Sequence, residues 1–321
     1  MTHLQPTQTA PRLSVVVVHW RNERQLAELL AAWPDEPRCE LLVVDNSSSL
    51  GELASPVRLI DPGCNLGFAG GANRGVAASR APWVFVLNPD VRPQEGAVER
   101  LLESLESFSE AAGVVPALVG ADGAPQHHWQ LRPLPSPGAL LLHTLFLAGV
   151  RGPRREPERG AVIGQPAGAA LVVRRSVLAE IGGFDAGFYP AWFEDVDLAR
   201  RLARAGHRLV YEPASRWVHA TGGSLPELGY GPFLWVYYRN LVRYLKIHHG
   251  GLWSLLARCV LPLGMGLRIL LLPLRRPRRA ASRAAAVVAL AAVIAGALSG
   301  WRRPRSYLRR FSPPAVGSTA L

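Results

Sequence analysis

The chain has 321 residues, 49% of them hydrophobic, and carries a formal net charge of +12. This length holds one large α/β domain with an appendage or two small domains, and the apolar content excludes a largely disordered chain. The polar first residues contain no apolar run, so we expect no signal peptide. Three cysteines without metal-type spacing exclude a disulfide framework and indicate a reducing cytosol.

The positive charge is concentrated in the C-terminal part of the chain. All 24 acidic residues lie at or before Glu227, whereas 15 basic residues follow that position without any acidic one. Such an asymmetry predicts contact with a polyanion, either nucleic acid or an anionic membrane. Leucine, valine, tryptophan and alanine are interspersed with the arginines, which favours the membrane, and no nucleic-acid recognition motif is present.

The first 120 residues predict strands that alternate with helices. The short apolar run at 13–20 is rich in β-branched residues, as in a strand buried on both faces. A helical pattern at 23–33 and a second buried strand at 40–48 complete a βαβ unit with parallel strands. The same alternation continues with predicted strands at 57–63, 83–90 and 113–120 and helices at 69–80 and 94–108.

The pattern is lost between 121 and 160, which predicts a loop-rich insertion. A strand and a short helix are expected within 164–185, closed by two glycines. The next helix opens with Glu194, Asp195 and Asp197, and a final strand is predicted at 207–213. Carboxylates in the first turn of a helix are favoured by the helix dipole, so one interpretation of these three is structural. Three acids beside aromatic residues also suit a base that faces a sugar hydroxyl.

Five motifs in this order resemble the family 2 glycosyltransferases, and most closely their bacterial rhamnosyltransferase-like branch. They are VVVVHWRN at 15–22, LLVVDNSS at 41–48, NLGFAGGANRG at 65–75, VFVLNPDV at 84–91 and FEDVDLARRLARAG at 193–206. The resemblance covers roughly residues 13–250. It implies a GT-A fold, which is an α/β, Rossmann-like arrangement of a mostly parallel sheet with flanking helices. We expect a flexible N-terminus at 1–12, the GT-A domain at 13–230 and basic, apolar helices at 231–321.

Polar side chains stand at or just past the predicted strand ends, where ligands of an open parallel sheet bind. The resemblance implies that Asp45 accepts hydrogen bonds from the base or ribose of a nucleoside diphosphate sugar. Taken alone, the glycine-rich segment at 67–75 also fits an ordinary turn before a helix. The nucleotide-sugar site is expected to comprise His19, Asn22, Asp45, Asn46, Asn65, Gly67, Asn73 and Asn88.

The Asn-Pro-Asp sequence at 88–90 fits a simple turn, and it also occupies the place of the DXD motif of the family. The last Asp of that motif binds a divalent cation that bridges the two phosphates. Here Asn88 replaces the first Asp, so the site keeps one carboxylate, Asp90. His219, expected after the last strand, matches a histidine that commonly binds the metal in the family. The resemblance therefore implies Mg²⁺ or Mn²⁺ held by Asp90 and His219, with phosphate and water as further ligands.

Asp195 is the candidate general base, which takes a proton from the acceptor hydroxyl as this attacks the anomeric carbon with inversion. Asp197 is expected to cap its helix or to pair with Arg200 or Arg201. The insertion at 121–160 is expected to cover the acceptor side of the site. The residues that we expect to contact the acceptor or sugar are Trp192, Phe193 and Glu194. For the two aromatic residues, burial in the core is the alternative.

After residue 230 the pattern predicts an amphipathic helix with a basic face. The apolar stretch at 252–274 is interrupted by Arg258, Pro262 and Arg268, which argues against a simple membrane span. The uncharged segment at 284–301 has five arginines on each side and hence no orientation signal. Helices lying in the plane of an anionic membrane explain the pattern better, and a membrane hairpin is the alternative.

The sequence therefore predicts a metal-dependent, inverting glycosyltransferase on the cytoplasmic face of the inner membrane, with no nucleic-acid partner. The resemblance suggests dTDP-rhamnose as donor and a lipid-linked or free saccharide of cell-envelope polysaccharide synthesis as acceptor. A UDP-sugar transferase, for example of galactofuranose, is the closest alternative. A non-catalytic scaffold of the same fold is the alternative from another class, since the Asn-Pro-Asp motif has lost a carboxylate.

Overall fold

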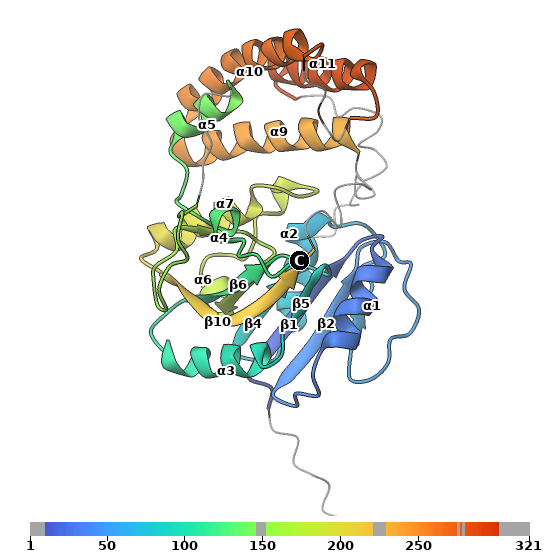
Figure 1. Cartoon of the computed structure of the whole chain (residues 1–321), viewed down its shortest axis with the longest axis vertical. Helices are drawn as coiled ribbons and strands as arrows, with labels where there is room; N and C mark the ends of the chain where they lie inside the picture. The colour runs from blue at the N-terminus through green and yellow to red at the C-terminus, as the bar shows by residue number, and fades with distance from the viewer. Residues whose placement is uncertain (1–9, 146–151, 221–228, 275–276, 278–279, 302–321) are drawn as a thin grey trace, which may run out of the picture.

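The computed structural model describes residues 10–145, 152–220, 229–274, 277 and 280–301. Residues 1–9 of the N-terminus that we expected to be flexible lie outside these ranges, as do nine of the ten arginines that flank 284–301. Figure 1 shows two layers along the long axis of the molecule, a sheet with its flanking helices and a separate layer of helices.

The central sheet has eight strands in the order β3-β2-β1-β4-β9-β6-β10-β5. Four pairs of neighbouring strands are parallel and three are antiparallel, the latter because β9 runs against β4 and β6 and β5 runs against β10. This arrangement confirms the predicted α/β fold with a mostly parallel sheet. The strands are β1 (Leu13–His19), β2 (Cys39–Asp45), β3 (Arg58–Ile60), β4 (Trp83–Leu87), β5 (Val91–Pro93), β6 (Gly113–Val119), β9 (Ala170–Arg174) and β10 (Leu209–His219).

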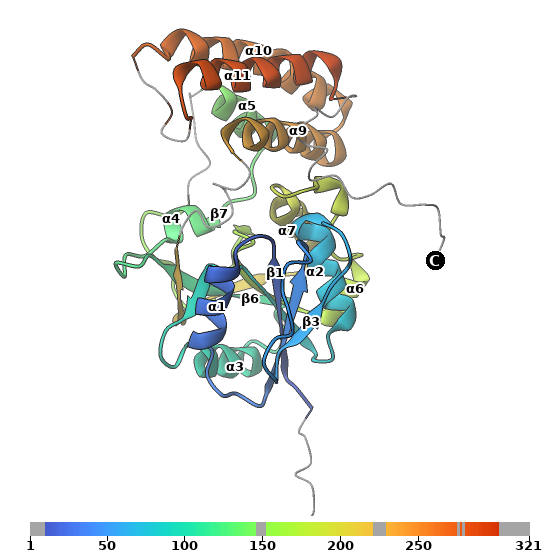
Figure 2. The ribbon, with the colours of Figure 1, turned by 90° about the vertical axis from the view of Figure 1, so that its right-hand side faces the viewer.

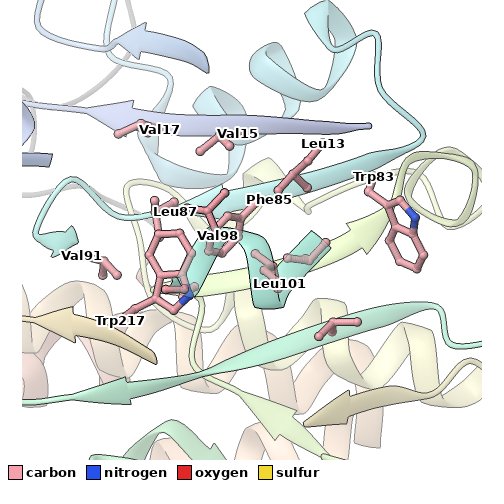
Figure 3. Packing of buried hydrophobic residues seen from close by; sticks show 14 of the residues in the cluster. Leu13, Val15, Val17, Trp83, Phe85, Leu87, Val91, Val98, Leu101 and Trp217 are labelled. Atoms are coloured by element: carbon pink, nitrogen blue, oxygen red, sulfur yellow. The ribbon is translucent and has the colours of Figure 1, made fainter. Parts of the chain in front are cut away.

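Both faces of the sheet are covered, because successive side chains of a strand point to opposite faces. Val15 and Val17 of β1 belong to a cluster with residues of α1 and α3, whereas Val16 and Val18 belong to one with residues of α2, α6 and α7. Figure 3 shows the first of these clusters around Trp217, whose side chain is fully buried. The covering helices are α1 (Glu23–Ala32), α2 (Gly67–Ala78), α3 (Ala97–Ser107), α6 (Arg175–Glu180) and α7 (Glu194–Arg204).

The last strand corrects the sequence-based prediction, which ended it at residue 213. The ladder between β10 and β6 shifts register between Glu212 and Arg216 and then continues, so His219 is the final residue of β10. Pro213 lacks a backbone donor and marks the irregularity, which looks like a strand end in the sequence. The buried Ser215 hydroxyl bridges the interruption, since it donates to Ala97 and accepts from the indole of Trp217.

The insertion at 121–160 contains more regular structure than the lost periodicity predicted. It holds α4 (His127–Gln130), β7 (Leu131–Arg132) and α5 (Pro137–Thr144), and β7 pairs with β8 (Gln165–Pro166) in a small antiparallel sheet. These elements are short, and a two-residue strand or a one-turn helix carries no readable hydrophobic period. In both views of the molecule α4 and α7 lie between the large sheet and the helical layer (Figures 1 and 2).

The helical layer consists of α9 (Tyr230–His249), α10 (Gly251–Leu271), α11 (Arg283–Ser299) and α5 (Figure 2). Its buried core is continuous with the segment that leads into α7, because Phe188, Phe193 and Val196 belong to the same cluster as buried residues of α9, α10 and α11. By length and composition α10 could cross a membrane, with a mean hydropathy of 1.6 over its most apolar window. The helices are therefore packed onto the domain next to the helix that carries the acidic motif.

Candidate active site

A cavity of about 360 Å³ opens at the carboxyl ends of β1, β4 and β10. Segments far apart in the chain form its wall, including the turn after β4, the residues before β9 and the start of α7. Nine of the residues that the sequence singled out line this cavity, namely Asn46, Asn65, Gly67, Asn88, Asp90, Trp192, Glu194, Asp195 and His219. The structure thus brings half of the predicted nucleotide site, both predicted metal ligands and the predicted base to one space.

The first two strand ends form a buried network behind the cavity wall. His19 Nδ1 lies 2.9 Å from Asp45 Oδ1, and the Asp45 carboxylate also accepts hydrogen bonds from the backbone of Ser47, Ser49 and Leu50. Burial disfavours its charge, but these hydrogen bonds outweigh burial and lower the pKa of Asp45 to about 2. Both carboxylate oxygens are already engaged, so Asp45 shapes the loop after β2. Its contact with the donor stays a prediction and requires that some of these bonds be exchanged.

The side chains of two further residues of the predicted nucleotide site form hydrogen bonds to the protein backbone. Asn22, which is buried, accepts a hydrogen bond from the Trp20 backbone amide. Asn73 joins α2 to the turn before the acidic motif, since its amide donates to the Phe184 carbonyl at 2.8 Å and accepts from the Phe184 backbone at 2.9 Å. Asn73 does not line the cavity, so its contact with the nucleotide stays a prediction. The pairing joins positions 111 residues apart and leaves no local signal.

Gly67 is a position that only glycine can occupy without strain. Its φ is +69°, and a Cβ atom there would stand 2.8 Å from both the Pro190 carbonyl oxygen and the Tyr189 ring. The next residue, Phe68, donates its backbone N–H to the same carbonyl at 2.7 Å. The glycine-rich segment therefore holds the start of α2 against the turn that leads into α7.

Asp90 and His219 face one another across the edge of the sheet, with Oδ2 and Nε2 3.7 Å apart. The His219 Nδ1 lies 2.9 Å from the Gln126 side-chain oxygen, so the ring donates there and turns the Nε2 lone pair toward Asp90. Burial lowers the pKa of His219, although the charge of Asp90 opposes the shift. A neutral imidazole and a carboxylate are suitable ligands for a divalent cation.

These two residues fit a cation that takes its other ligands from outside the protein. Within the described ranges no group of three or more histidine, cysteine or acidic side chains could hold a metal ion. Asn88, which replaces the first Asp of the motif, adds no carboxylate, and its side chain lines the cavity. The Trp129 ring lies 5.1 Å from the His219 ring and closes this end of the cavity.

Asp195 lies in the first turn of α7 and lines the same cavity. Its Oδ2 accepts hydrogen bonds from the Gly168 backbone at 3.2 Å and from the Gln165 side chain at 3.3 Å. Glu194, beside it, is buried, and one of its oxygens has no hydrogen-bond partner among the described residues. Burial, followed by the charge of Asp195, raises the pKa of Glu194 well above its usual value. Glu194 is therefore suited to donate a proton or hydrogen bond, while Asp195 is held in place to accept one.

Asp197 has a structural position, which settles the alternatives that the sequence left open. Its carboxylate pairs with Arg201 at 2.7 Å, one helical turn further along α7. The other oxygen lies 2.7 Å from His248 Nε2, near the end of α9. Asp197 is almost completely buried and does not line the cavity, so it anchors α7 to the helical layer.

The turn before α7 separates two neighbouring aromatic residues. Trp192 and Phe193 both have left-handed backbone conformations, with φ of +72° and +75°. Trp192 lines the cavity, whereas Phe193 packs between the rings of Tyr237 and Tyr244 on α9 and is 5% exposed. Burial in the core, the alternative that the sequence left open for both residues, therefore applies to Phe193. The left-handed turn sends it into the core of the helical layer.

Asn240 of α9 holds this turn from the other side. It is completely buried, and its amide nitrogen lies 2.9, 2.9 and 3.0 Å from the carbonyl oxygens of Phe188, Ala191 and Trp192. Two consecutive left-handed residues with bulky side chains cost about 1–3 kcal/mol each and persist only where their surroundings impose them. Asn240 supplies that constraint, so the direction of Asp195 and Glu194 depends on the helical layer.

Several cavity residues were not anticipated from the sequence. Trp129 and Arg132 come from the insertion at 121–160, where neither a motif nor a period marked them. Gly168 approaches Asp195 closely, since a Cβ atom there would lie 3.2 Å from the Asp195 Cβ. Trp20, which directly follows the first strand, also lines the cavity, although the sequence motif pointed only to its polar neighbours His19 and Asn22. Its position at a strand end was the one signal that could have identified it.

The comparisons with known proteins agree with this geometry. The family model described as glycosyl transferase family 2 matches residues 14–182, which is more than half of the chain. An N-acetylglucosaminyl-diphospho-decaprenol L-rhamnosyltransferase of Mycobacterium tuberculosis is 31% identical over 288 residues, covering 80% of this chain and 91% of that protein. A rhamnosyltransferase of Escherichia coli is 26% identical over 221 residues, covering 64% of this chain and 81% of that protein.

Among solved structures, a mannosyltransferase of Pyrobaculum calidifontis in complex with GDP-Man and Mn²⁺ superposes with a TM-score of 0.51 at 16% identity. The superposition covers 92% of this chain and 88% of that one, and at this identity it supports the fold alone. The family match, the two relatives and the shared fold lead to one conclusion. The chain belongs to the family 2 glycosyltransferases and has their GT-A fold.

Proposed function

We propose that this glycosyltransferase moves rhamnose from dTDP-rhamnose to a lipid-linked saccharide of cell-envelope polysaccharide synthesis, with inversion at the anomeric carbon. One observation carries the proposal: the Asp90–His219 pair and the held carboxylate of Asp195 line the same cavity. The relative from M. tuberculosis, whose length is matched almost completely, supports rhamnose as the sugar and a diphospho-lipid saccharide as the acceptor.

The residues of the cavity divide the reaction between its two ends. At one end, Asp90 and His219 would hold a divalent cation, Mg²⁺ or Mn²⁺, and Asn88 stands beside them to bind the donor. When bound, such an ion supplies positive charge against the negative charge of the leaving diphosphate. The Trp20, Trp129 and Trp192 side chains provide apolar faces for the sugar rings.

At the other end, Asp195 acts on the acceptor. The acceptor hydroxyl oxygen forms a bond to the anomeric carbon, the bond from that carbon to the diphosphate oxygen breaks, and the hydroxyl proton passes to Asp195. Gly168 and Gln165 orient the carboxylate before the substrate arrives, which lowers the entropic cost of reaching the reactive geometry. Glu194, whose pKa is raised by burial, stands beside Asp195 and faces the cavity, where it can hydrogen-bond a sugar oxygen.

A donor screen with purified protein tests the proposal. Release of the nucleoside diphosphate is measured for dTDP-rhamnose and UDP-galactofuranose with Mn²⁺ or Mg²⁺, with and without N-acetylglucosaminyl-diphospho-lipid. We expect acceptor-dependent release from dTDP-rhamnose. Acceptor-dependent release from UDP-galactofuranose alone would establish the alternative donor, and no release from either would support the scaffold interpretation.

We expect Asn240→Leu to reduce kcat by about tenfold to a hundredfold, because a displacement of about 1 Å at a catalytic group has that effect. The change keeps the size of the side chain but removes the hydrogen-bond donor to three buried carbonyl groups. We expect this loss to lower the free energy of unfolding by about 1–3 kcal/mol. Donor affinity should stay unchanged. Steady-state kinetics, isothermal titration with the donor and urea unfolding give the three quantities.

Leu261→Ala is the matched control for Asn240→Leu, because Leu261 is fully buried in the same core and lies outside the hydrogen-bonded turn. Its expected cost is about 2–5 kcal/mol of folding free energy, at least as large as that of Asn240→Leu. The control should nevertheless retain kcat. If kcat falls equally in both variants, Asn240 has no specific role in positioning the acidic motif.

For the location of the enzyme, we infer peripheral binding to the cytoplasmic face of the inner membrane, with α10 and α11 in the membrane plane. The two arginines that interrupt the apolar sequence of α10 form hydrogen bonds within the helical layer. Arg258 donates to carbonyl groups near the end of α11, and Arg268 donates to the Thr144 carbonyl of α5. The outer side of α10 therefore stays apolar, with leucines at 252, 255, 263 and 270 between 54% and 76% exposed.

This arrangement favours the in-plane interpretation over the hairpin. The inner side of α10 packs into the core that it shares with α9 and α11, through Ala257, Leu261 and Met265. Moving α10 across a bilayer would remove this apolar surface from its partners and break the bonds of both arginines. The basic residues beyond α10 would then add attraction to anionic lipid of about 1 kcal/mol each.

We expect the double substitution Leu263→Glu and Leu270→Glu to reduce flotation with anionic liposomes strongly, because it places two charges in the apolar face. The control, Ala27→Glu with Ala31→Glu on exposed positions of α1, adds the same charge far from that face. It should float like the wild type, and high salt should release part of the bound wild type. Binding that resists both salt and carbonate would contradict the in-plane interpretation.

A further inference from the structure

Arg132 is a cavity residue to which the reaction described above assigns no role. It lies in β7 and lines the cavity, and its Nε atom is buried. Among the described residues, that nitrogen has no hydrogen-bond partner and the guanidinium forms no ion pair. A partly buried cation without an anion is costly, and an arginine fork matches the geometry of a phosphate group. The position of Arg132 in the cavity therefore suits the binding of an anionic ligand.

Cross-strand pairing in the small sheet places Arg132 beside a residue that holds Asp195. The segment starts at Gln126, which bonds His219, and passes Trp129, which packs against the same ring. It then turns into β7, where Arg132 stands opposite Gln165 in the small sheet. Because the Gln165 side chain bonds Asp195, Arg132 belongs to the end of the cavity that holds the base.

Tyr237 of α9 supports this placement. Burial raises the pKa of Tyr237 to about 12 and the neighbouring Tyr238 adds to the shift, whereas the Arg132 cation opposes it and the Asp195 carboxylate adds a smaller part. The Tyr237 ring lies 5.3 Å from the ring of Phe193, the residue directly before the acidic motif, so Tyr237 marks where the helical layer meets the start of α7. The chain continues from Arg132 into α5, which packs against α10. Arg132 therefore stands between the base and the helices that we expect on the membrane.

We infer that Arg132 binds a phosphate group of the acceptor, a saccharide joined to its lipid through a diphosphate. The inference rests on the proposed function and adds the residue that would recognise the link between saccharide and lipid. A hydroxyl that reaches Asp195 belongs to a sugar whose diphosphate would lie nearby, and the lipid beyond it would continue toward α9 and α10. The donor diphosphate is the other source of the same chemistry, at the Asp90–His219 end.

Binding measurements on Arg132→Gln distinguish the two sources without requiring turnover. The probes are a farnesyl-diphospho-N-acetylglucosamine, an octyl N-acetylglucosaminide without phosphate, and dTDP-rhamnose. We expect the first to bind about ten- to a hundredfold more weakly than to the wild type, which is the usual effect of losing a charge-assisted hydrogen bond. Binding of the other two should be unchanged, and Arg132→Lys should recover part of the loss.

Arg208→Gln is the control for net charge, because Arg208 is exposed and lies outside the cavity. Equal losses for both acceptor probes, or a loss confined to dTDP-rhamnose, would overturn the inference, and the latter would assign Arg132 to the donor. Unchanged binding of all three probes would overturn it as well. A wild type that binds the diphospho-lipid probe but transfers no sugar would contradict the proposed function while leaving the role of Arg132 in place.

Discussion

Asp195→Asn is expected to reduce sugar transfer by about a hundredfold or more, within the usual contribution of a general base of about 10²–10⁴. The amide keeps the size of the side chain but cannot accept the proton of the acceptor hydroxyl. Donor affinity should remain close to that of the wild type, because the proposed role of Asp195 is to act on the acceptor. Single-turnover kinetics with saturating donor and isothermal titration with the donor separate the two effects.

Asp197→Asn is the matched control on the same helix. It removes the same charge two residues away, at a side chain that pairs with Arg201 and His248 outside the cavity. We expect it to lower the free energy of unfolding by about 3–5 kcal/mol, as for other buried pairs that lose one partner, and to retain kcat in the folded fraction. If Asp195→Asn keeps near-normal turnover, the base has to be sought at Glu194.

Asp90→Ala is expected to weaken donor binding much more in the presence of Mn²⁺ than in its absence. Asp90 is the one carboxylate of the Asn-Pro-Asp motif, and even outer partners of metal ligands contribute about 10–100-fold in affinity. The loss of Mn²⁺ affinity in the presence of a nucleoside diphosphate should therefore be at least tenfold, about the lower end of that range. Electron paramagnetic resonance of free Mn²⁺ measures it without relying on turnover.

Asn88→Asp provides the opposite test, since it restores the carboxylate that the motif lacks. We expect tighter Mn²⁺ binding from it, whereas EDTA should reproduce the Asp90→Ala defect in the wild type. Full activity in EDTA would contradict the assignment of both Asp90 and His219. Tighter binding by Asn88→Asp together with normal behaviour of Asp90→Ala would move the cation away from Asp90.

The features that could be predicted from the sequence are those set by local patterns. Runs of β-branched apolar residues predicted the buried strands, because a strand covered on both faces has few other compositions available. The acidic motif was correctly placed in the first turn of α7, since helical periodicity follows it directly. The order of five motifs predicted the family, which the family model and the relatives confirm. Each strand, helix and motif behind these predictions is a local pattern, and only the order of the motifs extends along the chain.

The tertiary structure decided what depends on packing between distant segments. Trp192 and Phe193 are adjacent and chemically similar, yet a left-handed turn held by Asn240 sends one to the cavity and the other to the core. Asn73 is engaged by Phe184, and Arg132 reaches the cavity through a two-residue strand in a segment without period. A side chain's direction follows from backbone geometry and long-range contacts. Neither is encoded in the spacing of residue types along the chain.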